Sequence, residues 1–266
     1  MWLLNVALEY IAPLFLVLSP ITSYADQIWS IHKNKSSAGF SLDIPLIMLL
    51  ASILKVFYWF GAYYSYSLLI QAIVMVAVQV VLLKVALDNR PSPGVKDGIE
   101  HVPFSSHAES SGLWRPYGFW QWRSSSPYWT SMTYFTFTLL LIHVFLPPIA
   151  QSPTYISFLG YAGLGIEAFL PVPQILANQR VQSCKGFRLS VLGAWLIGDG
   201  MKMGYFFLSK ELIPWAFRIS GILQCSCDCY LGVQYYMFEV RGMGRRGRGI
   251  SNVDGAEDRE KDIRLA

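Results

Sequence analysis

The sequence contains an internal repeat at a spacing of 147 residues, and this feature constrains the fold more than any other. Placing residues 26–60 over residues 173–207 needs no gap. The identical positions include glutamine, glycine, lysine and aromatic residues: Gln27/Gln174, Ile28/Ile175, Ser36/Ser183, Gly39/Gly186, Phe40/Phe187, Leu42/Leu189, Leu49/Leu196, Lys55/Lys202, Tyr58/Tyr205 and Phe60/Phe207. A repeat of this length indicates two similar structural units in one chain.

Composition and apolar stretches place both units in a membrane. Hydrophobic residues make up 53% of the 266 residues and charged residues only 14%, whereas soluble domains contain about 25% charged residues. A helix that spans a bilayer needs about 20 mostly apolar residues. Stretches of this kind occur at 10–31, 42–61, 66–87, 128–149, 156–178, 189–208 and 213–238. We therefore expect an all-α polytopic membrane protein with seven transmembrane helices.

The first apolar stretch is expected to be a retained helix, although Ser23, Tyr24 and Ala25 resemble a signal-peptide cleavage site. A signal peptide begins with a positively charged region. Here no Lys or Arg precedes Lys33, and Glu9 is acidic. The stretch also has a counterpart in the second repeat, at residues 157–178.

The basic residues predict the orientation, because Lys and Arg accumulate on the cytoplasmic side of a membrane. With seven spans the loops alternate between the two sides, and Lys210 is almost alone on one of them. The other side collects Lys33, Lys35, Lys84, Arg90, Lys96, Arg115, Arg123, Arg180, Lys185, Arg188, Arg241, Arg245, Arg246 and Arg248. The N-terminus is therefore predicted to be lumenal and the C-terminus cytosolic.

These features predict two parallel three-helix repeats joined by a linker helix, a 3+1+3 arrangement. The repeats are assigned to residues 10–87 and 156–238, and the linker helix to 128–150. The cytosolic loop 88–127 is rich in Trp and Arg, which suits either a segment at the headgroup level or a plain linker. The polar tail 239–266 has the composition of a disordered segment.

The second repeat resembles a PQ-loop. It has Pro173-Gln174 after a long apolar stretch, then a basic loop with Lys185-Gly186-Phe187-Arg188-Leu189-Ser190, then another apolar stretch. Residues 27–42 resemble a first copy through Gln27 and Gly39-Phe40-Ser41. The arrangement is similar to the fold of PQ-loop transporters, SWEET sugar transporters and the KDEL receptor.

Two further segments resemble one branch of this family. They are residues 54–61, with the sequence LKVFYWFG, and residues 198–206, with the sequence GDGMKMGYF. The branch contains PQ-loop repeat-containing protein 1 of animals and a fungal antagonist of a Golgi/endosomal aminophospholipid flippase. The resemblance implies a role in transbilayer phospholipid distribution as a scramblase in late Golgi or endosomal membranes.

The two repeats differ at the proline of the motif, because Asp26 stands where the second repeat has Pro173. A proline inside a helix removes a hydrogen bond and frees the carbonyl four residues back. Pro171 and Pro173 therefore predict a kinked or flexible fifth helix, and Pro20 predicts a hinge further from Gln27 in the first. Asp26 itself is interpreted as a surface charge near the cytosolic end of its helix.

Charged residues within the apolar stretches carry the strongest functional signal. Lys55 and Lys202 occupy equivalent positions of the two repeats, and a lysine at the centre of a membrane helix costs about 2.5–3.5 kcal/mol. Asp199 lies three residues before Lys202, so the two can pair on one helix face. Ser52 occupies the position equivalent to Asp199, so Lys55 is expected to be the freer cation and to need a partner from another helix or a ligand.

Glu167 and Asp228 are the other acids within the apolar stretches that could meet these lysines. With Gln27, Pro173 and Gln174 they complete the predicted transport path between the repeats. The alternative is a set of ion pairs that only fixes helix packing. In the tail, Arg245, Arg246 and Arg248 are predicted to contact the anionic cytoplasmic leaflet, each contributing about 1 kcal/mol.

Two classes of function stay open. In a phospholipid scramblase, a polar groove between the repeats lets a headgroup cross while its acyl chains stay in the bilayer. In a proton-coupled carrier for an amino acid or another small solute, the central acids titrate and the site lies between the repeats. A third hypothesis is that the protein is a sorting receptor with the same fold. The sequence decides neither proton coupling nor whether the chain forms a homo-oligomer.

The sequence favours no enzymatic chemistry. It has no arrangement typical of a catalytic triad or a phosphate-binding loop, so we expect no catalytic residue, cofactor or nucleic-acid partner. Cys225, Cys227 and Cys229 alternate along an apolar helix, so we expect them to pack between helices rather than surround a metal. His143 is likewise expected to be a packed side chain.

Overall fold

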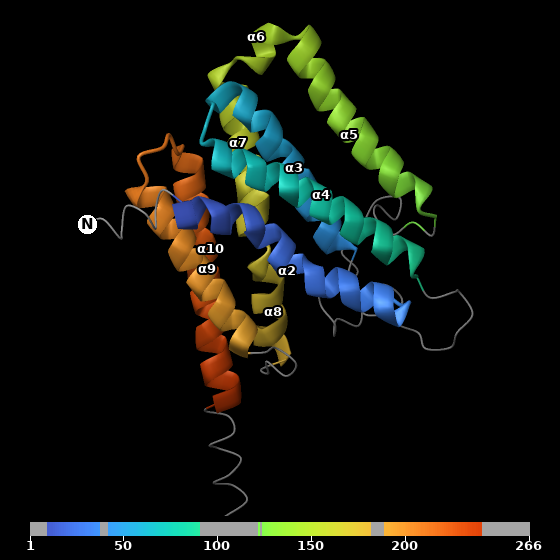
Figure 1. Cartoon of the computed structure of the whole chain (residues 1–266), viewed down its shortest axis with the longest axis vertical. Helices are drawn as coiled ribbons and strands as arrows, with labels where there is room; N and C mark the ends of the chain where they lie inside the picture. The colour runs from blue at the N-terminus through green and yellow to red at the C-terminus, as the bar shows by residue number, and fades with distance from the viewer. Residues whose placement is uncertain (1–9, 38–41, 91–121, 123, 182–188, 241–266) are drawn as a thin grey trace, which may run out of the picture.

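The computed structural model describes residues 10–37, 42–90, 122, 124–181 and 189–240, and these residues form helices and their connections, with no strand. The first half contains α2 (Ala12–Asn34), α3 (Asp43–Ala62) and α4 (Tyr66–Asp88). Helix α4 lies between α2 and α3 and packs against both. The three helices run roughly along one another (Figure 1).

The second half repeats this order. Its helices are α7 (Pro153–Ala168), α8 (Pro171–Val181), α9 (Leu189–Leu208) and α10 (Trp215–Tyr235). Helix α10 packs against α7 and α8 on one side and against α9 on the other. In both halves the last helix therefore lies between the first and the second, so the sequence repeat is also a repeat in space. A π-helical turn, η3 (Tyr236–Val240), continues α10.

The connection between the halves is broken by proline. Helix α5 (Ser126–Phe145) ends before Pro147, and the short α6 (Pro147–Ala150) follows. A proline cannot donate the backbone hydrogen bond that would continue α5. The predicted linker helix 128–150 is therefore two helices. Most of the 88–127 loop and the whole of the tail from 241 onwards lie outside the described residues.

Two of the described helices, α3 and α4, are both long and apolar enough to meet a simple criterion for crossing a membrane. The remaining helices are more polar or shorter. Helices α7 and α8 have 16 and 11 residues because the chain breaks between them.

The break between α7 and α8 confirms the predicted kink in the fifth helical segment. The carbonyl of Glu167 accepts a hydrogen bond from the backbone N–H of Leu170, and the carbonyl of Phe169 accepts one from Val172, so each closes a tight turn. Helix α2, by contrast, continues through Pro20. Pro20 therefore leaves its helix continuous, whereas the helix breaks before Pro171. This difference agrees with the unequal positions of these prolines in the two repeats.

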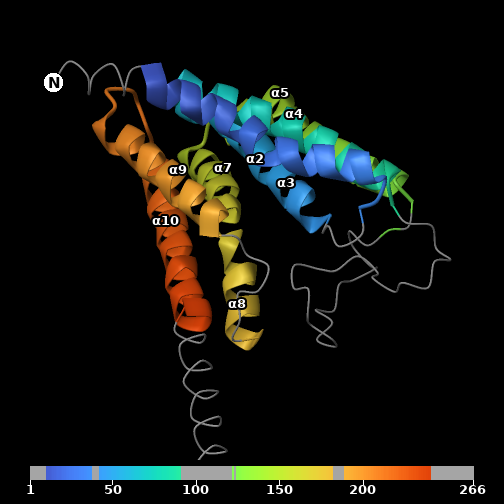
Figure 2. The same cartoon turned by 60° about the horizontal axis from the view of Figure 1, so that its bottom comes forward.

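The two halves meet closely at one end and diverge toward the other (Figure 2). At the closed end, which comprises residues 63–65 and 209–214, the backbone N–H of Ser65 donates to the carbonyl of Leu212 over 3.1 Å. The Tyr205 hydroxyl lies 2.8 Å from Ser65 Oγ and donates to Glu211 over 2.8 Å. The two bonds of Ser65 join the repeats, and its backbone bond joins their equivalent loops. The opposite end, where α2, α8 and α10 finish, is the splayed end.

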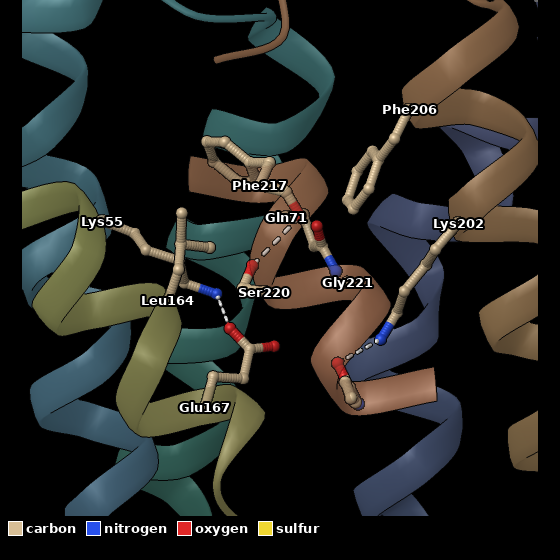
Figure 3. A pocket seen from close by; sticks show the side chains of 10 residues that line it. Lys55, Gln71, Leu164, Glu167, Lys202, Phe206, Phe217, Ser220 and Gly221 are labelled. Carbon is tan, nitrogen blue, oxygen red and sulfur yellow. Dashed lines mark hydrogen bonds and ion pairs between the residues drawn. The ribbon is translucent and has the colours of Figure 1, made fainter. Parts of the chain in front are cut away.

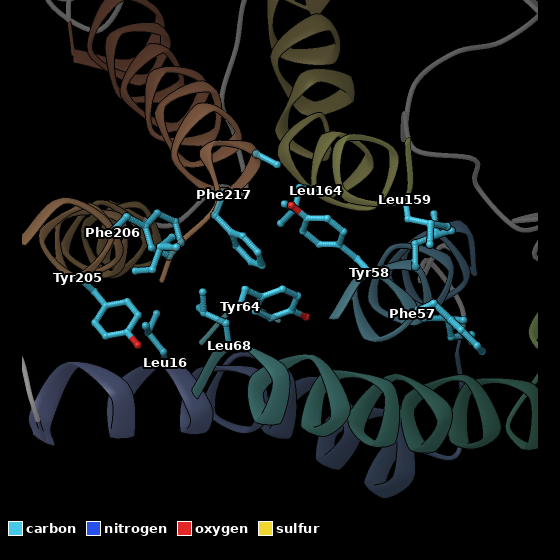
Figure 4. Close-up of a cluster of buried hydrophobic side chains, with 14 of the residues drawn as sticks. Leu16, Phe57, Tyr58, Tyr64, Leu68, Leu159, Leu164, Tyr205, Phe206 and Phe217 are labelled. Atoms are coloured by element: carbon cyan, nitrogen blue, oxygen red, sulfur yellow. The ribbon is translucent and has the colours of Figure 1, made fainter. Parts of the chain in front are cut away.

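A shared aromatic core holds the closed end together (Figure 4). Tyr58 and Tyr64 of the first half pack against Phe217 of the second, and the Tyr64 and Phe217 ring centroids are 4.8 Å apart. Aromatic pairs at this spacing contribute about 0.5–1.5 kcal/mol beyond the area that they bury. This core places the polar residues described next at the boundary between the repeats.

Candidate functional site

The two equivalent lysines reach one small pocket between the repeats from opposite sides (Figure 3). The pocket has a volume of about 30 Å³, and a buried water needs about 10–15 Å³. It is therefore large enough for only a few waters in this conformation. Its walls come from α3, α4, α7, α9 and α10: Lys55, Gln71, Leu164, Glu167, Lys202, Phe206, Phe217, Ser220, Gly221 and Gln224.

Lys55 is paired across the boundary between the halves. Its Nζ lies 2.5 Å from Glu167 Oε2, which joins α3 to the last turn of α7. The close approach depends on Gly163, since a Cβ there would lie 3.0 Å from the Ala51 carbonyl and from Leu54 Cβ. The expectation that another helix supplies the partner of Lys55 is confirmed, and Glu167 rather than Asp228 is that partner.

Lys202 is held less tightly. Its Nζ lies 3.3 Å from Gln224 Oε1 and 3.8 Å from Asp199 Oδ1, and its side chain keeps 20% of its surface exposed. The predicted pairing of Asp199 with Lys202 on one helix face is confirmed. The prediction that Lys55 is the freer lysine is wrong. Helix α7 brings a carboxylate to 2.5 Å from Lys55, whereas the acid nearest Lys202 reaches it only at 3.8 Å.

Asp199 and Asp228 form a second polar group beside the pocket. They are 4% and 2% exposed, and the carboxylate of Asp228 on α10 interacts with that of Asp199 on α9. Among the described residues, Asp199 Oδ2 and Asp228 Oδ1 have no hydrogen-bond partner. Buried oxygens of this kind are uncommon. When ionised, the three carboxylates and two lysines of the site carry one excess negative charge.

Three polar residues of α10 were not predicted as a group. Ser220 and Gln224 line the pocket and Asp228 lies one turn beyond them. Their spacing of four residues places them on one helix face, and this periodicity in the sequence could have identified the set. Gln71 of α4 also lines the pocket, although glutamines of this kind usually only join helices.

Gln27 and the predicted hinge residues Pro20 and Pro171 do not line the pocket. Gln27 is exposed on α2 and Pro20 is buried inside it. Pro171 begins α8 at the break. The side chains of Pro173 and Gln174 lie outside the described part of the chain, as do Arg245, Arg246 and Arg248 of the tail.

Comparison with known proteins gives two matches. A model of the PQ loop repeat matches residues 14–68 and 155–215, which include most of α2 with α3 and most of α7 with α8 and α9. The chain is also 28% identical to the protein named Scramblase ANY1 of Saccharomyces cerevisiae. That similarity covers 87% of this chain and 71% of the yeast protein.

Proposed function

We propose that the chain, which matches the PQ loop repeat over residues 14–68 and 155–215 and is similar to a protein named as a scramblase, is a phospholipid scramblase. The similarity to a protein named as a scramblase extends over both repeats and supports this function. In this proposal the protein resides in late Golgi or endosomal membranes and opposes an aminophospholipid flippase. It spans the membrane seven times, with a lumenal N-terminus and a cytosolic C-terminus.

The observation that carries the proposal is a partly exposed lysine between the repeats whose nearest carboxylate lies beyond hydrogen-bond distance. Lys202 has 20% of its side chain exposed and its acid 3.8 Å away. An ammonium group at this depth attracts the phosphate of a headgroup and so lowers the cost of taking that phosphate through hydrocarbon. Lys55 is neutralised by Glu167 and supports the site without being its primary ligand.

In this conformation the pocket between the lysines is small. Small-molecule sites usually have volumes of about 300–1,000 Å³, against about 30 Å³ here. A headgroup that moves along an open face needs no such cavity, because its acyl chains remain in the bilayer.

The test is reconstitution of the purified full-length chain into liposomes that contain a headgroup-labelled fluorescent phospholipid. A membrane-impermeant quencher reaches only the outer leaflet, so scrambling raises the quenched fraction above that of protein-free liposomes. A rate equal to that of protein-free liposomes contradicts the proposal. Radiolabelled amino-acid uptake, driven by a proton gradient in the same liposomes, tests the alternative.

That alternative, a proton-coupled carrier, is favoured by one observation. Asp199 and Asp228 are buried next to each other with unpartnered oxygens, and such a pair can share a proton. Gradient-driven uptake that Asp228→Asn abolishes, without lipid movement above background, would replace the scramblase proposal with this one.

A further inference from the structure

The two repeats should meet at two equivalent helix–helix contacts, here called seams, and among the described residues only one of them is closed along its length. In the α3–α7 seam, Gly160 and Gly163 allow close contact: a Cβ at Gly160 would lie 2.7 Å from the Tyr58 ring. In the α2–α9 seam, a Cβ at Gly198 would lie 3.7 Å from its nearest neighbour, the Phe15 ring. Beyond this contact, α2 and α9 diverge toward the splayed end (Figures 1 and 2).

The part of α2 that leaves α9 carries a polar face. At 100° per residue, Ser19, Thr22, Ser23, Asp26 and Ser30 lie on the same side of the helix as Phe15. We call these five residues the polar face of α2. All are exposed or half-buried. Near the closed end, this side of α2 places Phe15 against α9. Where the seam opens, the same side presents hydroxyl groups and a carboxylate.

The other sides of α2 have different surroundings. Tyr24, Ile28 and Ile31 pack within the first half. Leu18 and Ile21 are 44% and 45% exposed and lie next to the polar face, as expected for residues that contact acyl chains. One helix therefore presents a polar path directly beside an apolar surface.

The polar face extends too far along α2 to be only its solvated end. At about 1.5 Å per residue, Asp26 lies about 12 Å and Ser19 about 22 Å from the end of α2 at Asn34. The hydroxyls of Ser19 and Thr22 donate to carbonyls of their own helix, which lowers the cost of exposing them to lipid. Placing a carboxylate in hydrocarbon is costly in free energy, and no hydrogen bond within the helix lowers that cost. Asp26 therefore needs water or a polar headgroup beside it.

We propose that the α2–α9 seam is the path of the phospholipid headgroup, which moves along the polar face of α2 between Lys202 and the splayed end. Lys202, on α9, attracts the phosphate, and the polar face replaces part of its hydration shell. The acyl chains remain against Leu18 and Ile21. This inference rests on the proposed scramblase function and assigns to it one of the two seams.

Thiol labelling in liposomes tests whether the seam holds water and headgroups. Single cysteines at Thr22 or Asp26 are placed in a chain whose native cysteines are replaced: Cys184, Cys225, Cys227 and Cys229. The matched controls are Ile21→Cys and Ala25→Cys, each adjacent in sequence, at the same depth and on the acyl-chain side. A charged, membrane-impermeant thiol reagent should label Thr22→Cys and Asp26→Cys at least about tenfold faster than the controls, which is a clear difference in barrier height.

Transport in the same liposomes tests the occupant. Because the reagent acts on protein that is already folded, labelling of Asp26→Cys should slow scrambling by about tenfold, whereas treatment of Ala25→Cys should not. In addition, Ser23→Leu combined with Asp26→Leu should slow scrambling without lowering the thermal unfolding temperature. The control, Ile21→Leu combined with Ala25→Leu, should scramble like the parent chain.

The outcomes separate this inference from the function on which it rests. Equal labelling at all four positions, or normal scrambling after Asp26→Cys is labelled, overturns the seam assignment while scrambling by the parent chain upholds the function. If the parent chain moves no lipid above the protein-free level, the proposed function fails, and the assignment of a lipid path fails with it.

Discussion

Lys55 Nζ lies 2.5 Å from Glu167 Oε2, and this contact joins the two repeats at the point where the fifth helical segment breaks. Glu167 occupies the last turn of α7, two residues before Phe169 caps it. After the break, α8 packs against α10 and, among the described residues, makes no comparable contact with the first half. The ion pair therefore marks the limit of close contact along the α3–α7 seam.

The first prediction is that Glu167→Gln destabilises the fold. The substitution leaves Lys55 buried without a counter-charge, and breaking a buried pair in this way costs about 3–5 kcal/mol. Thermal unfolding in detergent should show a marked decrease in midpoint for this variant. The double variant Lys55→Met with Glu167→Leu removes both charges and should recover most of the loss. Equal stability of the parent and Glu167→Gln would contradict the role of the pair.

The second prediction ranks the lysines. Lys202→Ala should slow scrambling by at least about tenfold, a barrier increase of about 1.4 kcal/mol, with little change in stability because its acid is 3.8 Å away. Lys55→Ala should mainly reduce stability. Lys202→Arg retains the charge and should preserve most of the rate. If Lys55→Ala proved fully stable and inactive, this prediction would be wrong, and Lys55 rather than Lys202 would be the primary ligand of the phosphate.

The third prediction concerns the closed α3–α7 seam. Gly163→Ala places a Cβ about 3.0 Å from Ala51 O and Leu54 Cβ, and overpacking of this kind costs about 1–3 kcal/mol. Gly165 lies on the same helix with nothing within 4 Å of an added Cβ, so Gly165→Ala should be neutral or raise stability by about 0.5–1 kcal/mol through helix propensity. Chemical or thermal unfolding of both variants checks the difference, and equal effects would refute the close packing.

The fourth prediction concerns the C-terminal tail, which lies outside the described residues. Replacing Arg245, Arg246 and Arg248 by Gln should weaken binding of a tail peptide to phosphatidylserine vesicles, with each arginine contributing about 1 kcal/mol. Binding of the unmodified peptide should also fall as salt is added. Unchanged binding of the Gln variant would leave these residues only a role in setting topology.

The pairing of Lys55 illustrates how far the site could be read from the sequence. The embedded lysine and its lack of an acid one turn away predicted a partner from another helix, and Glu167 was among the candidates. The choice between Glu167 and Asp228 depended on the close approach of α7 to α3 at Gly163. The same approach made Lys202 the freer lysine, contrary to the prediction.

The sequence by itself determined the repeat, the approximate helix limits, the proline break after α7 and the residues that need polar partners. These properties follow from local periodicity, backbone chemistry and the cost of burying charge, each of which acts over a few residues. The tertiary structure alone decided that Asp199 meets Asp228, that the α3–α7 seam is closed and that the polar face of α2 lies along the open one. Those relations depend on how two whole bundles are rotated against each other, and that rotation is set by contacts summed over distant helices.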